Sequence, residues 1–404
     1  MTRILVVGAG PAGVMAAIAA KRRDPAAAVA LLSAEDAAPY EKPPLSKAVL
    51  LGRAMPEDAP IVPPDQLAGA DIELGRGIAV QAIDRRRKCV VTADGRCLPY
   101  DRLVLTTGGR LCELAVAPRA TPGVHYLRDA ADALALRAAL RPGRRVAVVG
   151  AGLIGLEVAA ASATLGLATT VLDIAPSIMA RAVPGALADI IQARHEAEGI
   201  SFRLGIGIVA CQAGAAGIVL RLADGTEITA DIVVVGVGVR PDDGLAREAG
   251  LRTDDGILVD ENCRTSDPDI FAAGDATRFR HAGSAGFRRE ENWRHALDHG
   301  AIAGANAAGG DAAYRAVPSF WSEQYDLFIQ GVGSVQASAG DPVRRLHGER
   351  KLIHFHMADD RIHYAVGIGA AKEMALARRI IERGIAVPAE SLSDPQVNLA
   401  ALLR

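Results

Sequence analysis

Two stretches of the chain share one pattern of apolar and polar positions. Each begins with a basic residue, continues with four apolar residues and a glycine-rich turn, and ends in a largely apolar segment, at residues 3–23 and 145–165. A short apolar run bounded by glycine predicts a buried parallel strand, and the segment behind it predicts a helix. We therefore expect two strand–turn–helix units in one chain.

The similarity between the two halves extends beyond these units. Each unit is followed by short strands, an Asp-Gly hairpin signal and an apolar strand that ends in glycine. The hairpin signals are Asp94-Gly95 and Asp224-Gly225, and the strands that follow them lie within 100–108 and 230–236. A repeat of this length predicts two related nucleotide-binding domains rather than one domain with a spare motif.

The rest of the chain does not follow this repeated pattern of strands and helices. Residues 118–144 carry prolines and an Ala/Leu-rich helix, which we interpret as a crossing between the two domains. From Val317 onward, short strands are expected at 331–336, 351–355 and 361–368, with a helix over 372–383. We therefore predict an α/β fold with two Rossmann-like dinucleotide-binding domains and a third, C-terminal α+β domain.

The glycines of the two turns follow a Gly-x-Gly-x-x-Gly spacing, at Gly8, Gly10 and Gly13 and again at Gly150, Gly152 and Gly155. The first glycine of such a set permits a tight turn, the second lets the backbone approach a pyrophosphate, and the third lets helix and strand pack closely. The backbone N–H groups and the helix dipole then bind the phosphates. Two copies, each directly behind an apolar run, indicate two dinucleotide sites.

An acidic residue at the end of the second strand of such a unit accepts hydrogen bonds from the adenosine ribose. The first unit offers Glu35, with Asp36 as the adjacent alternative, and the second offers Asp173. A carboxylate here repels the 2′-phosphate of NADPH, and the next arginine after Asp173 is Arg181. We therefore expect NADH to be preferred over NADPH. The alternative is that Asp173 is a solvated acid at a strand end.

The segment 265–275 supplies the reason to assign FAD to the first unit. It predicts a strand that ends in Gly274-Asp275. This arrangement puts a carboxylate at the start of a helix, where it can accept hydrogen bonds from the ribityl hydroxyls of FAD. A Gly-Asp pair alone is a common turn, and it becomes specific only together with the two dinucleotide folds.

Composition and charge exclude some classes of function for this protein. The chain has 404 residues and a net charge of −2, which excludes a global electrostatic attraction to nucleic acid or membranes. The longest apolar runs, such as 232–239, are far too short for a membrane span, and the first predicted strand begins at Ile4, which leaves no room for a signal peptide. We expect a cytoplasmic protein without a metal site, either a monomer or a homodimer.

The cysteines exclude one kind of redox centre. The chain contains five, Cys89, Cys97, Cys112, Cys211 and Cys263, and none of them forms a CxxC or CxxxxC pair. An odd number of scattered thiols fits a reducing compartment. We expect each to be a small buried or strand residue rather than a redox centre.

Several longer segments carry a family resemblance. They include Tyr40-Glu-Lys-Pro-Pro-Leu-Ser-Lys47, Gly238-Val-Arg-Pro241, Arg289-Glu-Glu-Asn-Trp293 and Phe320-Trp-Ser-Glu-Gln-Tyr-Asp326. With the glycine motifs, Thr107-Gly108 and Gly274-Asp275, they make the chain similar over essentially its whole length to the FAD-dependent NADH:ferredoxin reductases of bacterial oxygenase systems. That family belongs to the glutathione-reductase-like flavoproteins with two dinucleotide-binding domains. The sequence departs from the family at Lys42, where arginine is usual, and at His295, where asparagine is.

The resemblance implies a domain layout and a set of cofactor contacts. The FAD domain would comprise residues 1–113 and 238–316, the NAD domain 114–237, and a C-terminal domain, 317–404, would cover the flavin. Contacts with FAD or NAD are expected from Gly8, Gly10, Ala12, Gly13, Glu35, Lys42, Pro43, Lys47, Val80, Thr107, Gly108, Arg128, Gly150, Gly152, Ile154, Gly155, Glu157, Asp173, Arg181, Gly238, Gly274, Asp275, Glu291, Trp293 and Trp321.

Two of these residues are the catalytic candidates. By resemblance, Lys47 lies near flavin N5 and pairs with Glu157. A carboxylate partner keeps a buried lysine charged, and that charge could stabilise the electron-rich reduced flavin. The alternative is that Lys47 is a surface lysine behind a proline-rich turn.

Two further features are expected near the flavin. The resemblance places Glu291 at the start of a helix over 292–308, whose dipole would stabilise negative charge on the flavin pyrimidine. Trp293 and Trp321, the only tryptophans, are expected to pack at the flavin. Trp321 is also a candidate for passing electrons outward.

The absence of cysteine between residues 24 and 88 indicates which kind of electron acceptor to expect. Reduced FAD has no thiol there to receive its electrons, so a one-electron protein acceptor is left, and the family's acceptor is an acidic [2Fe–2S] ferredoxin. Docking candidates near the flavin motifs are Arg288, Arg289, Arg294 and Arg315, whereas the run 85–88 is interpreted as a solvated turn. Alternatives are an NADH:rubredoxin or monodehydroascorbate-type reductase and, in another class, a signalling flavoprotein like the apoptosis-inducing factors.

Overall fold

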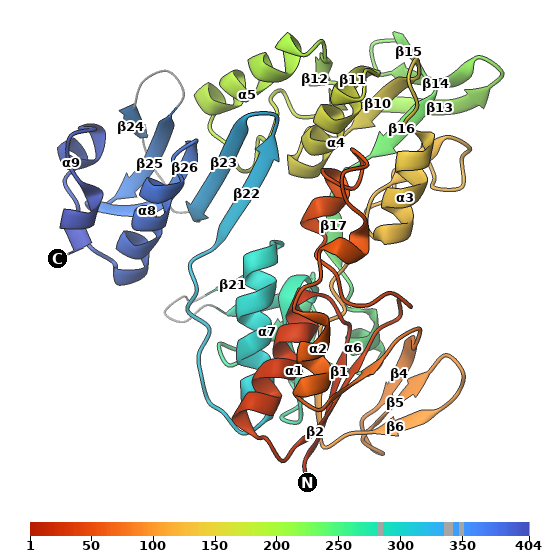
Figure 1. Cartoon of the computed structure of the whole chain (residues 1–404), viewed down its shortest axis with the longest axis vertical. Coiled ribbons are helices and arrows are strands. Elements are labelled where there is room, and N and C mark those ends of the chain that lie inside the picture. Colours follow the sequence, from red (N-terminus) through yellow and green to blue (C-terminus); the bar gives the residue numbers. More distant parts are fainter. Residues whose placement is uncertain (281–285, 335–341, 347–350, 404) are drawn as a thin grey trace. The chain divides into compact units, whose positions relative to one another are not determined.

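The computed structural model describes residues 1–280, 286–334, 342–346 and 351–403 (Figure 1). The chain divides into two compact units. The first unit contains residues 1–43, 55–110 and 239–316, and the second contains 44–54, 111–238 and 317–404. No helix in the described ranges is long and apolar enough to span a membrane.

A five-stranded parallel sheet forms the centre of the first unit. Its strands in spatial order are β19 (Ile270–Ala272), β7 (Arg102–Leu105), β1 (Arg3–Val7), β2 (Ala28–Leu32) and β3 (Ile72–Gly75). Ile4 and Val6 of β1 belong to one hydrophobic cluster, and Leu5 and Val7 belong to another. The four residues after Arg3 are therefore all apolar, because both faces of the sheet are covered.

Two helices cover one face of this sheet and lie side by side (Figure 1). They are α1 (Pro11–Arg23) and α7 (Trp293–Ala307). A Cβ atom at Gly300 would lie 2.1 Å from the carbonyl oxygen of Ala12, so only glycine permits this close helix contact. The predicted helix over 292–308 is thus confirmed, with Asn292 as its N-cap.

Smaller elements complete the first unit. They are the meander β4 (Val80–Asp84), β5 (Cys89–Thr92) and β6 (Cys97–Pro99), the sheet of β18 (Ile257–Val259), β20 (Thr277–Arg280) and β21 (Phe287–Arg288), the pair β8 (Gly109–Leu111) and β17 (Val239–Pro241), the helices α2 (Pro64–Gly69) and α6 (Gly244–Glu248), and the 3-10 turns η2 (Pro56–Asp58) and η3 (Gly274–Ala276).

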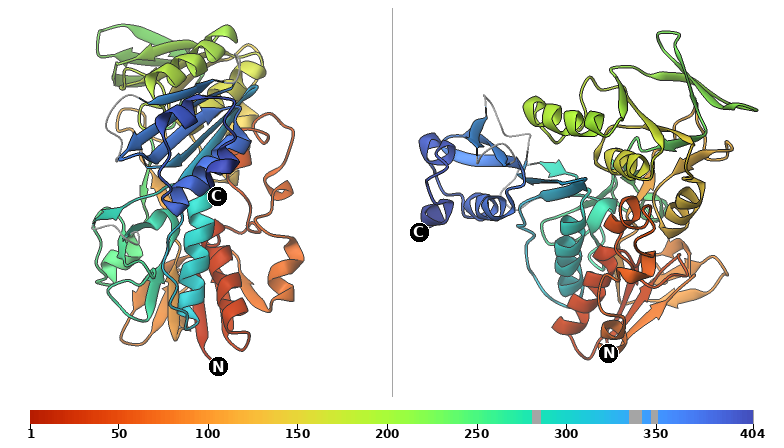
Figure 2. Two further views of the ribbon diagram at one scale, coloured as in Figure 1. Left: turned by 90° about the vertical axis from the view of Figure 1, so that its left-hand side faces the viewer. Right: turned by 45° about the horizontal axis from the view of Figure 1, so that its top comes forward.

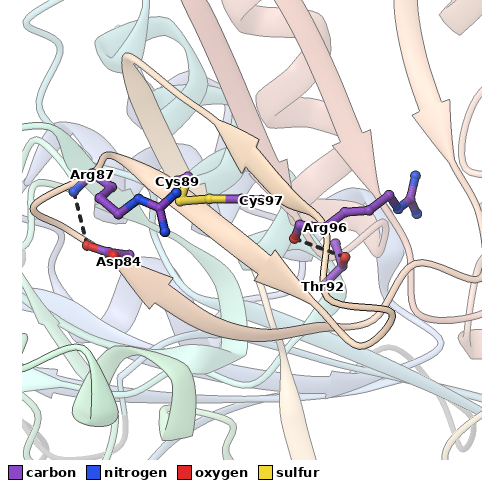
Figure 3. The surroundings of a disulfide bond; sticks show 6 residues. All are labelled: Asp84, Arg87, Cys89, Thr92, Arg96 and Cys97. Carbon is purple, nitrogen blue, oxygen red and sulfur yellow. Dashed lines mark hydrogen bonds between the residues drawn. A yellow bond between two sulfur atoms is a disulfide. The ribbon is translucent and has the colours of Figure 1, made fainter.

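A disulfide joins Cys89 and Cys97 in this meander (Figure 3). Both are strand residues, as expected, but the expectation of free thiols is wrong for this pair. The eight-residue separation matches no redox spacing, so the pairing could not be predicted from the spacing. The antiparallel pairing of β5 with β6 brings the two Cα atoms to 5.8 Å. Cys112, Cys211 and Cys263 are free thiols.

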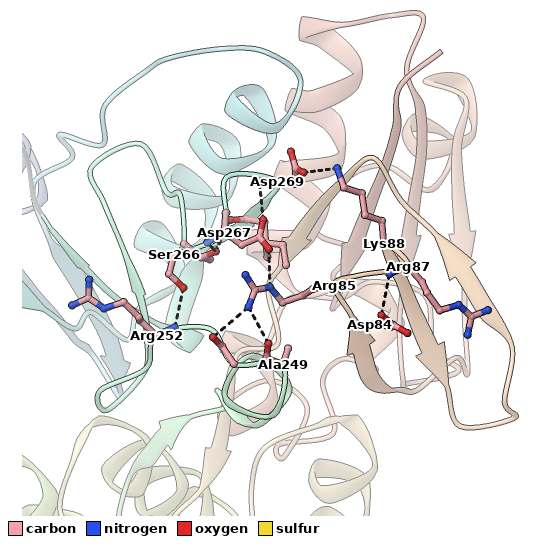
Figure 4. Close-up of polar contacts among 12 residues, drawn as sticks. Asp84, Arg85, Arg87, Lys88, Ala249, Arg252, Ser266, Asp267 and Asp269 are labelled. Carbon is pink, nitrogen blue, oxygen red and sulfur yellow. Dashed lines mark hydrogen bonds and ion pairs between the residues drawn. The ribbon is translucent and has the colours of Figure 1, made fainter.

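The basic run 85–88 is an exposed turn between β4 and β5, as predicted, and two of its side chains also form ion pairs (Figure 4). Arg85 Nε donates to Asp267 at 2.7 Å, and its Nη1 donates to the carbonyl oxygens of Ala249 and Gly250. Lys88 pairs with Asp269. These contacts fasten the meander to two segments more than 150 positions later in the chain, while Arg86 and Arg87 stay exposed.

The second unit repeats the architecture of the first. Its parallel sheet consists of β12 (Ser201–Leu204), β11 (Ala168–Asp173), β10 (Arg145–Val149), β16 (Ile232–Val235) and β9 (Val124–Tyr126). Its helices are α3 (Ala130–Ala139), α4 (Leu153–Thr164) and α5 (Gly185–Ala197), and its meander is β13 (Ile208–Gly214), β14 (Gly217–Leu222) and β15 (Glu227–Ala230). Both predicted Asp-Gly hairpin turns are present, between β5 and β6 and between β14 and β15.

The C-terminal part of the second unit is an antiparallel sheet with helices on one face (Figure 2). Its strands are β22 (Ser319–Gln324), β23 (Leu327–Gly333), β26 (Arg361–Ile368), β25 (Leu352–Ala358) and β24 (Val343–Leu346), followed along the chain by α8 (Ala371–Arg383), α9 (Ala389–Ser393) and η5 (Leu399–Leu403). The strand expected at 331–336 begins earlier, and its last two residues, 335 and 336, lie outside the described residues.

These elements confirm the predicted fold class. Each compact unit contains one five-stranded parallel sheet, and the second unit also contains the C-terminal α+β part. The segment 44–54, which includes part of η1 (Pro43–Ser46), belongs to the compact second unit although the chain enters it from the first.

Candidate functional site: two glycine cradles and a buried carboxylate

The first glycine motif forms a cradle between β1 and α1. Gly8 has a φ of +104°, and a Cβ atom there would lie 2.2 Å from the carbonyl oxygen of Thr106. A Cβ atom at Gly13 would lie 1.7 Å from the carbonyl oxygen of Gly8, whereas nothing lies within 4 Å of one at Gly10. The outer glycines are therefore needed for folding, and the middle one faces open space at the start of a helix.

The second motif reproduces this geometry between β10 and α4. Gly150 has a φ of +112°, and a Cβ atom there would lie 2.4 Å from the carbonyl oxygen of Gly236. At Gly155 the clash would be with Gly150 at 1.9 Å, and Gly152 again faces open space. Gly10 and Gly152 are N-cap residues without a side-chain cap, so these helix starts leave backbone N–H groups for a phosphate.

The two predicted ribose-binding acids lie at the ends of the second strands. Tyr40 donates to Glu35 at 2.6 Å, and the ammonium group of Lys42 lies 3.6 Å from the same carboxylate. Asp173 accepts from the backbone N–H groups of Ala151 at 2.6 Å and Ala175 at 2.8 Å. The Asp173 carboxylate is therefore fixed against the glycine turn rather than being a freely solvated acid.

A cavity of about 560 Å³ opens beside the second cradle. Its walls include the glycine turn, the end of β11 and the segment 174–182, and several predicted contacts line it: Gly150, Gly152, Asp173 and Arg181. Ile154 is exposed, and neither it nor Arg128 is among the lining residues. A Cβ atom at Gly238 would lie 3.9 Å from the Arg181 guanidinium group.

Gly274 and Asp275 form the short turn η3, which packs against α7. The backbone N–H group of Gly274 donates to Nδ1 of the fully buried His299 at 3.2 Å. His299, His295, Phe279 and Tyr314 form one aromatic cluster, in which His295 Nδ1 lies 2.8 Å from the Tyr314 hydroxyl. Burial lowers the pKa of His299 to about 3, so its ring is neutral and Nδ1 can accept this hydrogen bond.

The four arginines suggested for docking differ in accessibility. Arg288 stacks over Phe279 and lies 3.9 Å from Glu290, and burial lowers its pKa, so it is not a free surface cation as expected. Arg289 pairs with Asp255 and Glu291, and Arg294 pairs with Asp298. Arg315 is exposed. Glu290, the acid beside Arg288, is itself largely buried, and burial raises the pKa of its carboxyl group to about 7.

Lys47 and Glu157 are brought together in the second unit, although 110 positions separate them in the chain. The Lys47 ammonium group donates to Glu157 Oε2 at 3.2 Å, and the Glu157 side chain is only 6% exposed. The alternative that Lys47 is a surface lysine is wrong, because its side chain is four-fifths buried and ion-paired.

The remaining predicted residues take varied positions. Thr107 donates to the Asp242 carbonyl oxygen at 2.5 Å, and the Gly108 carbonyl oxygen accepts from the Asp242 N–H group. Others lie on regular elements: Ala12 in α1, Pro43 in η1, Val80 in β4, Trp293 at the start of α7 and Trp321 in β22. Glu291 directly precedes the N-cap of α7.

Several site residues were missed by sequence reasoning. Ser46 and Ser322 also donate to Glu157, Gln324 bonds to Ser322, and His195 bonds to Gln324. Ser322 and Gln324 alternate on a strand, so their two-residue spacing could have indicated one shared buried polar face. No sequence signal indicates His195.

Both cradles fit a dinucleotide. Each offers an open middle glycine, an uncapped helix start and an acid at the second strand end. In the first unit η3 adds Asp275, and in the second the cavity adds Arg181.

Comparison with known proteins agrees with this geometry. The pyridine nucleotide-disulphide oxidoreductase family matches residues 2–300, and the reductase C-terminal family matches residues 319–403. The ferredoxin–NAD(+) reductase component of an anthranilate 1,2-dioxygenase system from Burkholderia cepacia is 39% identical over 409 residues, covering 99% of this chain and 98% of that protein.

Two solved structures are similar over the whole chain. The ferredoxin reductase for the CYP199A2 system from Rhodopseudomonas palustris has a TM-score of 0.95 and 32% identity, with 100% of both chains covered. The covalent putidaredoxin reductase–putidaredoxin complex gives a TM-score of 0.94 and 32% identity, covering 100% of this chain and 98% of that one. This chain therefore belongs to the pyridine nucleotide-disulphide oxidoreductase family, with a reductase C-terminal domain and with FAD and NAD as its cofactors.

Proposed function

We propose that this chain is an NADH:ferredoxin reductase, which oxidises NADH and delivers electrons one at a time to a [2Fe–2S] ferredoxin that serves an oxygenase. The observation that carries the proposal is the pair of nucleotide cradles without a redox-active thiol pair. No cysteine lies between residues 24 and 88, and the Cys89–Cys97 disulfide does not have the CxxxxC spacing of disulfide reductases. A one-electron protein acceptor is therefore expected. The relatives from Burkholderia cepacia and Rhodopseudomonas palustris, at 39% and 32% identity, are named ferredoxin reductases.

The chain's own residues would bind and orient the two nucleotides. When bound, FAD accepts a hydride from NADH and releases electrons singly. Residues 1–113 and 238–316 would hold FAD through the first cradle, Glu35 and Asp275. Residues 114–237 would hold NADH through the second cradle and Asp173, and residues 317–404 would cover the flavin.

Lys47 and Glu157 have the catalytic roles in this proposal. The Glu157 carboxylate pairs with the Lys47 ammonium group and orients it, and the positive charge of Lys47 would stabilise negative charge on a bound flavin. The start of α7, behind Glu291, adds its helix dipole, and Trp293 and Trp321 pack at the flavin. The substrate NADH also supports a cytoplasmic location.

The test is an anaerobic titration followed by acceptor assays. One equivalent of NADH should bleach the yellow FAD-loaded protein, and NADPH should reduce it much more slowly because of the Asp173 carboxylate. Cytochrome c reduction should then depend on an added [2Fe–2S] ferredoxin.

Other results would identify an alternative. Faster reduction of rubredoxin or of ascorbyl radical than of any [2Fe–2S] ferredoxin would show that the acceptor is not a ferredoxin. Slow reduction by NADH, together with a change in assembly, would indicate a signalling flavoprotein. Efficient reduction by NADPH would overturn the assigned role of Asp173.

A further inference from the structure

A row of buried polar side chains in the second unit ends on the Glu157 carboxylate. Ser322 Oγ donates to Glu157 Oε1 at 2.6 Å. Lys47 Nζ, at 3.2 Å, and Ser46 Oγ both donate to Oε2. One carboxylate thus accepts three hydrogen bonds from two segments of the chain, 46–47 and β22.

The row continues away from Glu157 through two more side chains. Gln324 Nε2 donates to Ser322 Oγ at 3.0 Å, and His195 Nε2 lies 2.8 Å from Gln324 Oε1. Ser322, Gln324 and His195 are each 0% exposed. Water is therefore excluded from these groups, and each depends on its neighbour for a hydrogen bond.

Donor and acceptor chemistry permits only one direction along this row. The single Ser322 hydroxyl proton points to the carboxylate, so Ser322 must accept from the NH₂ group of Gln324. The Gln324 carbonyl oxygen then faces His195, which must carry its proton on Nε2. Burial lowers the pKa of His195, so the ring is neutral, and its Nδ1 atom has no hydrogen-bond partner among the described residues.

The positions of these groups in the fold explain how the row can orient the Glu157 carboxylate. Glu157 lies in α4, His195 in the last turn of α5, and Ser322 and Gln324 on one face of β22. Lys47 is the only charged side chain seen to bond to Glu157 within the described ranges. The row therefore holds the carboxylate through Oε1 while Lys47 binds Oε2, and a rotated carboxylate would release Lys47.

We propose that Ser322, Gln324 and His195 are positioning residues for the Lys47–Glu157 pair, acting as a one-way row of hydrogen-bond donors that holds the Glu157 carboxylate aimed at Lys47. This inference rests on the proposed role of Lys47 in flavin reduction. The three residues touch neither cofactor in this proposal and act only through Glu157.

The first test compares flavin reduction in the FAD-loaded protein by stopped flow at saturating NADH. Ser322→Ala should slow reduction about tenfold, because a displaced charge near a reacting centre costs at least this much. The matched control is Ser162→Ala, which truncates a fully buried serine of the same helix as Glu157 whose hydroxyl has no hydrogen-bond partner in the described structure. This control should reduce at the wild-type rate.

The second test uses His195, whose ring packs edge-on against Phe202 and Tyr325. His195→Phe keeps an aromatic ring but loses the donor, whereas His195→Gln restores an N–H group near the Nε2 position. The first variant should reduce slowly and the second should recover most of the wild-type rate. A purely structural role would give no recovery with glutamine.

The decisive measurement repeats Ser322→Ala in a Lys47→Ala background. If Ser322 acts through the ion pair, its effect on the rate disappears when Lys47 is absent. An equal effect in both backgrounds, or a wild-type rate for Ser322→Ala, would overturn the proposal. If the flavin of Lys47→Ala is reduced at the wild-type rate, Lys47 has no role in flavin reduction. The positioning role of Ser322, Gln324 and His195 is then excluded as well.

A readout without turnover separates positioning from chemistry. In urea unfolding of the FAD-loaded protein, Ser322→Ala and Glu157→Ala should be non-additive, because they remove the donor and the acceptor of one hydrogen bond. Additive changes in the unfolding midpoint would show that the two side chains do not interact, and the row would then have no positioning role.

Discussion

At the scale of single residues, the two buried histidines of the aromatic cluster and the nearby, largely buried Glu290 are groups whose pKa values move in opposite directions. Burial lowers the pKa of His299 to about 3, and it also lowers that of His295, to which the neighbouring His299 and Arg288 contribute. Burial raises the pKa of Glu290 to about 7, with Arg288 as the opposing charge. The folded protein therefore keeps these histidines neutral, and Glu290 takes up its proton near neutrality.

We predict that these groups affect stability between pH 7 and pH 5 with opposite signs. An unfolded histidine gains a proton as the pH falls through about 6.5, whereas folded His299 does not, so His299 costs about 2 kcal/mol of stability at pH 5 relative to pH 7. Folded Glu290 gains its proton before the unfolded residue does, so it adds about 2 kcal/mol over the same interval.

Urea unfolding at the two pH values measures both effects. His299→Asn, which retains an acceptor for the Gly274 N–H group, should lose less stability on acidification than the wild type, and Glu290→Gln should lose more. Identical pH dependence in all three proteins would mean that neither group has the protonation state derived from its burial.

At the scale of elements, Arg85 fastens the meander β4–β6 to the rest of the first unit. It makes one charge-assisted hydrogen bond to Asp267 and two bonds to backbone carbonyl oxygens. We predict that Arg85→Ala lowers the free energy of unfolding by roughly 1–2 kcal/mol, since hydrogen bonds to charged groups are stronger than neutral ones. The midpoint of thermal unfolding checks this.

The neighbouring Arg86 provides the control for Arg85. It is exposed in the same turn, so Arg86→Ala removes the same charge without a comparable loss of contacts. Equal midpoints for the two variants would show that the Arg85 contacts contribute nothing to stability.

Elements that depend on local pattern could be predicted from the sequence, and those that depend on distant partners could not. The strands and helices around Gly8 and Gly150 follow from apolar runs and glycine spacing, both of which are local. The three-residue strand β9 was missed because only its pairing with β16 defines it. The bonds from Ser46 and Ser322 to Glu157 span 111 and 165 positions, so no window of sequence contains them.

At the scale of the whole molecule, the net charge of −2 gives no long-range attraction to an acidic ferredoxin. Docking must therefore depend on a local group of basic residues. Of the four candidates, Arg288 is half-buried, and Arg289 and Arg294 already pair with acids of the same unit. The exposed Arg315 is left as the best single position at which to test docking.

We predict that ferredoxin reduction slows as ionic strength rises from about 0.02 to 0.2 M, because salt screens exposed charges over a Debye length of about 10 Å at 0.1 M. Arg315→Glu should slow ferredoxin reduction severalfold at low salt and leave flavin reduction by NADH unchanged. Arg86→Glu makes the same change in net charge, at the turn between β4 and β5, and should have little effect. If both variants slow the reaction equally, net charge rather than a local docking surface controls association, and if salt has no effect, docking is not electrostatic.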